Sequence, residues 1–149
     1  AITAAVGLAQ LERIEFLVKR RMSIGEMFND AVKGCSYLVP QAKSQDSIHT
    51  YYTYGVRYLG KEMKGITWKD FYNMYTAMGG SGFYSAWVNP YLEPVFKGKK
   101  LGNAILENGL CPIAEEYQKS IMLFKTNYRN LDHAKKDTDL LANLIREIG

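Results

Sequence analysis

The stretch ITAAVGLAQLERIEFLVKRRMSIGEMFNDAVKG, residues 2–34, decides the fold. Its apolar residues recur at three- and four-residue intervals with no proline between them, and Gly34 supplies a stop, so the pattern predicts one helix over residues 3–33. Such a helix is roughly 45 Å long at about 1.5 Å per residue. A compact domain of this length has a radius of gyration of only about 15 Å. We therefore expect the helix to lie against a second body, and the chain to be the C-terminal part of a larger protein.

The rest of the composition is that of one ordinary globular domain. The chain has 149 residues, of which 47% are hydrophobic and 23% charged, enough for a single domain with its own core. Its longest apolar runs are far shorter than the ~20 residues that cross a bilayer, and it does not start with a signal-peptide pattern. We expect a cytoplasmic protein with no membrane partner. Cys35 and Cys111 are widely spaced and predict neither a disulfide nor a zinc site.

The positive charge is spread over the chain. The net charge is +4, and the basic clusters at residues 19–21, 97–100 and 135–136 fall in three separate segments. A nucleic-acid-binding protein usually presents a basic stripe on one face. We interpret the three clusters as solvated surface and expect no nucleic-acid partner.

The order of the remaining patterns predicts an α+β fold. A polar loop at 41–47 precedes an alternating strand at 48–59, and Thr67 with Asp70 begins a short helix. Glycines end that helix, and the later elements are a strand at 83–88, mobile surface at 97–108, a short helix at 114–119, a strand at 121–125 and a final helix capped by Asp132. Together with the long first helix, these elements favour a small, mostly antiparallel sheet covered by helices on one side.

The sequence lacks the usual catalytic constellations. It has only two histidines, His49 and His133, and neither a serine triad spacing nor a metalloprotease or Walker motif is present. The glycines at 79–82 could cradle a phosphate, but a strand rather than a helix is predicted after them, so a plain connector is the better interpretation. His49, at the start of the predicted strand, could donate a hydrogen bond to a ligand or simply be solvated.

The segment FYSAWVNPYLEPVF, residues 83–96, is the most suggestive for binding. It places five aromatic side chains around Asn89 and Glu93, a mixture that can stack on a flat ring or sugar face and offer hydrogen bonds. The alternative is the aromatic rim of a core. Composition and spacing leave both open.

Several segments resemble the C-terminal domain of the DegT/DnrJ/StrS family of pyridoxal-phosphate-dependent sugar aminotransferases. AAVGLAQLERIEFLVKRR, residues 4–21, is similar to the helix that opens that domain. The order of the later segments agrees, namely HTYY at 49–52, MGGSGFYSAW at 78–87, PYLEPVF at 90–96, CPIAEEYQ at 111–118 and LFKTNYRN at 123–130. The resemblance covers nearly the whole chain.

This resemblance implies the small domain of a fold-type I aminotransferase. In such enzymes a large N-terminal domain carries the lysine that forms a Schiff base with pyridoxal phosphate. No lysine of this chain lies in a segment like that motif, so the missing N-terminal domain is the implied partner. The chain alone is expected to bind no cofactor, hold no catalytic residue and be inactive. The full-length enzyme is implied to be a homodimer that transfers an amino group, usually from glutamate, to a keto-sugar linked to a nucleotide.

The same resemblance implies a substrate-binding set. Many relatives carry a histidine shortly before a proline–aromatic pair, where it reaches the nucleotide-sugar; Tyr91 stands in its place here and can donate a hydrogen bond but take no positive charge. The segment at 79–87 also departs from the common form. We expect Trp87, Tyr91 and Glu93 to face substrate, with His49 as a second choice.

Two other functions remain open. One is a pyridoxal-phosphate-dependent sugar dehydratase of the same fold, in which a histidine replaces the Schiff-base lysine. The other is a non-catalytic interaction module, since the catalytic machinery lies outside this sequence. A lysine-bearing cofactor domain encoded upstream would distinguish an enzyme from a module.

Overall fold

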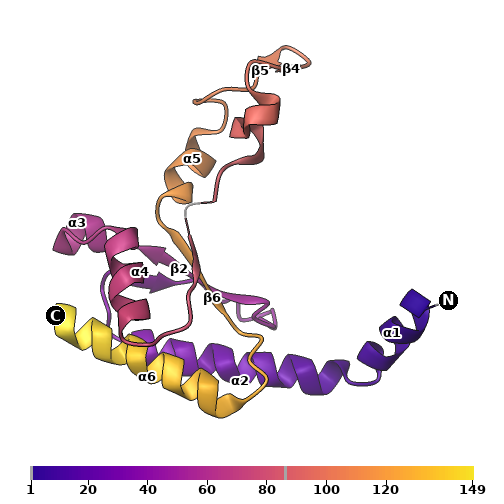
Figure 1. Cartoon of the computed structure of the whole chain (residues 1–149), viewed down its shortest axis with the longest axis vertical. Coiled ribbons are helices and arrows are strands. Elements are labelled where there is room, and N and C mark those ends of the chain that lie inside the picture. Colours follow the sequence, from indigo (N-terminus) through magenta and orange to yellow (C-terminus); the bar gives the residue numbers. More distant parts are fainter. Residues whose placement is uncertain (1, 86) are drawn as a thin grey trace.

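The computed structural model describes residues 2–85 and 87–149. It has a helix-covered sheet as its body, an arm that rises from the body, and an N-terminal helix that extends away from it (Figure 1). The described helices and small antiparallel sheet confirm the α+β class. None of the described helices combines the length and apolar character needed to cross a bilayer.

The N-terminal pattern forms two helices, α1 (Ile2–Leu11) and α2 (Ile14–Val32), so the prediction of a single continuous helix was wrong. At the break the N–H of Arg13 donates to the carbonyl of Gln10 at 3.1 Å, a tighter turn than in an α-helix. No residue of α1 is buried. Most helix stability in proteins comes from packing of one face, and α1 has no buried residue through which the described elements could hold it in line with α2.

The main sheet has the strand order β1-β2-β6-β3, with every neighbouring pair antiparallel. Its strands are β1 (Leu38–Pro40), β2 (Thr53–Tyr58), β6 (Ile121–Lys125) and β3 (Tyr84–Ser85). β6 matches its prediction. β2 is shorter than the predicted 48–59 because Tyr51 has φ 50°, outside the extended region. β3 covers only the start of the predicted 83–88, where Ala86 lies outside the described residues, and β1 was not predicted.

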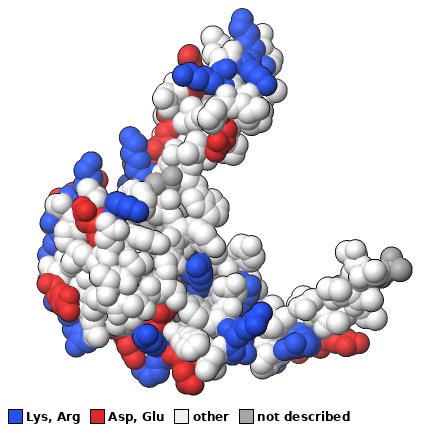
Figure 2. Space-filling view, viewed as in Figure 1, with Lys and Arg blue, Asp and Glu red and all other residues white. Residues whose placement is uncertain are grey.

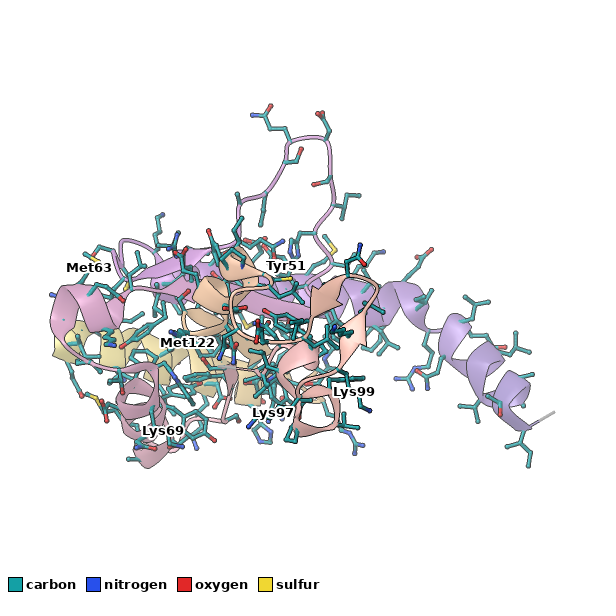
Figure 3. The ribbon with its side chains drawn as sticks, turned by 90° about the horizontal axis from the view of Figure 1, so that it is seen from above. Tyr51, Met63, Lys69, Lys97, Lys99 and Met122 are labelled. Carbon is teal, nitrogen blue, oxygen red and sulfur yellow. The ribbon has the colours of Figure 1, made fainter. Side chains whose placement is uncertain are left out.

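Three helices cover one face of the sheet: α2, α4 (Trp68–Ala77) and α6 (Leu131–Ile148). Alternate residues of β2 and β6 point into this core, and Phe28 of α2 stacks on Tyr54 with ring centroids 5.2 Å apart. Met122, fully buried, lies between the sheet and the helices (Figure 3). Tyr51 packs so closely on Gly25 of α2 that a β-carbon there would lie 2.4 Å from its ring. The body therefore has a hydrophobic core of its own.

The ends of α4 and α6 follow local capping rules. Thr67 and Asp70 form the predicted capping box at the start of α4. The predicted cap of α6 was two residues off, because Asn130 rather than Asp132 is the N-cap and its side chain accepts from the N–H of Asp132. A short helix, α3 (Gly60–Lys64), links β2 to α4.

The arm is built from short elements between β3 and β6. They are the 3₁₀ turns η1 (Pro90–Leu92) and η2 (Pro94–Phe96), the hairpin strands β4 (Lys100–Leu101) and β5 (Ala104–Ile105), and α5 (Pro112–Gln118). The hairpin was not predicted, because residues 97–108 hold little apolar sequence. Lys97 and Lys99 are exposed on the arm, where η2 leads into β4 (Figure 3).

Candidate functional site

The face of the sheet opposite the helices carries no covering layer in the described part of the chain. On β6 it presents Ile121, Leu123 and Lys125, each only half-buried, while the alternate residues point into the core. Tyr84 pairs with Leu123 across β3 and β6, so both side chains lie on this open face. Apolar side chains on an uncovered sheet face are a candidate binding or docking surface.

An apolar pocket of about 240 Å³ lies where this open face meets the base of the arm. Its floor is Tyr84, Ile121 and Leu123, and its walls come from the arm: Trp87 on one side and Tyr117 of α5 on the other. Asn89 and Gln118 add two amide groups, and Asn89 donates to Gln118 at 3.1 Å. Aromatic walls with a few fixed polar groups are typical of small-ligand sites.

Trp87 is the predicted site residue that the structure places in this pocket. Its ring meets that of Tyr84 edge-on, with centroids 5.5 Å apart, and its side chain is 61% exposed. An exposed tryptophan held by a single aromatic neighbour contributes little to the core and has a free face for stacking.

Tyr91 lies further along the arm, outside the pocket lining. Its hydroxyl donates to Glu115 Oε1 at 2.6 Å, and the N–H groups of Gly109 and Cys111 donate to the same carboxylate. The hydrogen bond from Tyr91 is the largest of the effects that lower the pKa of Glu115. Desolvation and the nearby carboxylate in turn raise the pKa of Tyr91 to about 12. In this structure the pair fastens η1 to the start of α5.

Glu93 and His49 lie apart from the pocket and from each other. Glu93 is exposed between η1 and η2. His49 accepts a hydrogen bond from the N–H of Tyr51 at 3.0 Å and lies 3.1 Å from Gln41 Oε1. The structure thus brings together Trp87 and residues not singled out from sequence, chiefly Tyr117 and Gln118. Tyr117 and Gln118 lie about thirty residues after Trp87 in the sequence, so only their proximity to β3 in the fold identifies them.

The glycine loop at 79–82 is a connector, as interpreted from sequence. Asp137 of α6, buried in the core, accepts from the N–H of Ser81 at 3.2 Å and also from the hydroxyl of Tyr128. A buried carboxylate that already occupies a loop N–H disfavours a phosphate there.

The lysines of this chain lie almost entirely on its surface. A Schiff-base lysine needs a desolvated amine of lowered pKa. Twelve of the thirteen are exposed, and Lys125, which is half-buried, stands over the ring of Tyr84 at 5.5 Å on the open face. Among the described residues, no group of acidic, histidine and cysteine side chains could hold a metal ion, and both cysteines are free thiols.

Comparison with solved structures finds the same fold in several aminotransferases. The aminotransferase from Psychrobacter cryohalolentis matches with a TM-score of 0.77 and 19% identity over 97% of this chain and 38% of its own. PseC of Helicobacter pylori, an aminotransferase involved in pseudoaminic acid biosynthesis, matches with a TM-score of 0.71 and 16% identity over 98% and 37%. The sugar aminotransferase CalS13 from Micromonospora echinospora matches with a TM-score of 0.68 and 11% identity over 96% and 34%.

The chain therefore spans just over a third of the length of these solved chains. No curated protein matches it in sequence. The profile of the DegT/DnrJ/EryC1/StrS aminotransferase family matches residues 1–122, which is most of the chain. The resemblance seen in residues 4–21 is confirmed on this larger scale, and the chain belongs to the DegT/DnrJ/EryC1/StrS aminotransferase family.

Proposed function

We propose that this chain is the small C-terminal domain of a pyridoxal-phosphate-dependent enzyme that transfers an amino group to a keto-sugar linked to a nucleotide. The family match and the one-third coverage of related aminotransferases support this division of the protein. The Schiff-base lysine and the groups that hold the cofactor phosphate would then belong to a large N-terminal domain. In such enzymes the cofactor acts as the electron sink that makes amino-group transfer possible.

The observation that carries the proposal is the apolar pocket where the open face of the sheet meets the arm. Its volume of about 240 Å³ is below the roughly 300–1,000 Å³ of sites for drug-sized ligands, so it suits one ring rather than a whole nucleotide-linked sugar. In the proposed enzyme, Trp87 stacks on the sugar while Asn89 and Gln118 offer hydrogen bonds. The large domain supplies the opposite wall, and closure of the two excludes water.

The proposal keeps the other sequence-derived expectations for the full-length protein. It is a cytoplasmic homodimer with glutamate as the usual amino donor, and Tyr91, Glu93 and His49 remain candidate contacts of the longer substrate. Aminotransferase chemistry is proposed ahead of the dehydratase because the family profile and the similar structures are those of aminotransferases. A family match over residues 1–122 also weighs against a non-catalytic module.

Substitution of Trp87 by alanine in the full-length enzyme tests the pocket. Loss of a stacking face should raise the KM for the nucleotide-linked keto-sugar about tenfold, as expected for a contact worth ~1–1.5 kcal/mol, with little change in thermal stability. Tyr91→Phe, which removes one hydrogen bond, should raise the KM by less. Met63→Ala on α3 is the matched control, since Met63 is 49% exposed and outside the pocket.

Steady-state kinetics and thermal melts of these variants distinguish a role of Trp87 in substrate binding from a role in the stability of the fold. An unchanged KM for Trp87→Ala together with a large loss of thermal stability would mean that the pocket is an aromatic rim of the fold. Equal effects of Trp87→Ala and Met63→Ala would also contradict the proposal.

A further inference from the structure

Four of the six arginines in the chain line one hollow, at the point where α1 joins α2. The hollow has a volume of about 620 Å³ and lies between the end of α1, the first half of α2 and the segment that follows β6. Arg13, Arg20, Arg21 and Arg129 line it, together with the amides of Gln10 and Asn127. We call this the arginine pocket.

The charge of the arginine pocket has no counterpart among the described residues. No acidic side chain lines it, and the ion pairs that the structure contains lie elsewhere. Glu12 and Glu15 are on neighbouring positions of the chain but do not line it, and Glu15 pairs with Lys19 at 3.9 Å. Figure 2 shows basic atoms gathered where α1 joins the body, with acidic atoms at one edge.

The arginines are held in place by neutral groups. Arg21 donates to the carbonyl of Tyr52 at 2.7 Å, and Arg20 donates to the carbonyl of Arg129. The guanidinium groups of Arg13 and Arg20 both stand over the ring of Phe16, at 6.0 and 5.7 Å. Two positive charges held over one ring repel each other. The arginines are therefore already in position, and a bound anion would offset their repulsion.

The pocket also contains hydrogen-bond donors without acceptors. The Nε of Arg20 is shielded from solvent and has no hydrogen-bond partner among the described residues. A shielded donor without a partner is unfavourable, and each such group in a native structure calls for an explanation. In the described part of the chain, the guanidinium groups of Arg13 and Arg129 make no hydrogen bond either.

We propose that the arginine pocket is an anion-binding site that takes a diphosphate group. A planar guanidinium matches phosphate oxygens in a bidentate manner. Four positive charges without a counter-charge are better matched by the several negative charges of a diphosphate than by one carboxylate. The proposal does not depend on the proposed function, because it concerns binding by this chain alone.

Isothermal titration calorimetry of the chain with inorganic pyrophosphate, in magnesium-free buffer, tests this site. We expect saturable 1:1 binding that weakens with added salt. Orthophosphate should bind more weakly, and glutamate, a dicarboxylate, more weakly still. The double variant Arg13→Gln/Arg129→Gln should bind pyrophosphate at least about tenfold less tightly, since a charged hydrogen bond contributes on that order.

The matched control is Lys97→Gln/Lys99→Gln, which removes the same charge from the exposed surface of the arm. Its affinity should stay within about twofold of the original chain. Thermal melts check that both double variants fold, and Arg13→Gln alone serves if the double variant does not. Equal losses in the two double variants would mean non-specific charge attraction and would overturn the site. Tighter binding of glutamate than of pyrophosphate, or no binding of pyrophosphate, would overturn it as well.

Discussion

At the scale of single residues, the contact between Tyr91 and Glu115 makes the stability of the arm depend on pH. The Tyr91 hydroxyl and the N–H groups of Gly109 and Cys111 hold the pKa of Glu115 below its ordinary value. A carboxyl with a lowered folded-state pKa stabilises the fold above its unfolded pKa, and this contribution is lost as pH falls through the folded pKa. The arm should therefore keep this contribution in mild acid and lose it only as pH falls below the ordinary pKa range of a glutamate.

Tyr91→Phe should raise the pKa of Glu115 towards its ordinary value, because it removes the largest cause of the shift. Carbon-detected NMR titration of the Glu115 carboxyl measures this directly. Tyr84→Phe is the control, since Tyr84 lies in the apolar pocket and not beside Glu115, and it should leave that pKa unchanged. The same Glu115 pKa in the chain with and without the Tyr91 hydroxyl would show that the hydrogen bond is not formed in solution.

At the scale of elements, α1 is the part least explained by the chain itself. It carries no charged residue, none of its residues is buried, and its leucines Leu8 and Leu11 are 60% and 61% exposed. Most of α1 projects away from the body (Figure 3), and only its end borders the arginine pocket. A helix that is apolar all round is normally covered, so we expect α1 to pack on another surface: a large domain in the full-length enzyme, or a second copy of the isolated chain.

We predict that the isolated chain self-associates through α1. Leu8→Glu/Leu11→Glu should weaken this association more than tenfold, since each change removes a buried apolar contact and introduces a charge. Sedimentation equilibrium gives the association constants. Leu101→Glu, at a site 74% exposed on the arm hairpin, should leave the association unchanged. A chain that is monomeric at all concentrations, with these leucines protected, would contradict the prediction.

The elements also show where sequence patterns suffice. β6 and the α4 capping box were predicted because the alternation of 121–125 and the Thr67–Asp70 pair are local signals. The break between α1 and α2, the positive φ of Tyr51 and the strand β1 were missed because they depend on packing. The hollows were missed for the same reason. Trp87 and Tyr117 meet only in the fold, as do Arg20 and Arg129, so no spacing along the chain could reveal either pocket.

At the scale of the whole molecule, the proposed enzyme divides cofactor binding and closure of the site between two domains. The body folds around its own core, but one sheet face and α1 remain uncovered in the described residues, and twelve of the thirteen lysines are exposed. All three features follow if this chain is the small domain of a larger enzyme. They would need separate explanations if the chain held a catalytic centre of its own.

The most direct test is a cofactor titration of residues 1–149, followed by borohydride reduction and peptide mapping, with the full-length protein as the positive control. We predict no internal-aldimine absorbance band, no stoichiometric adduct and no amino-group transfer for the 149-residue chain. The full-length protein should give one adduct, on a lysine outside these residues. A stoichiometric adduct on a single lysine of the 149-residue chain, together with turnover of a keto-sugar, would contradict the account.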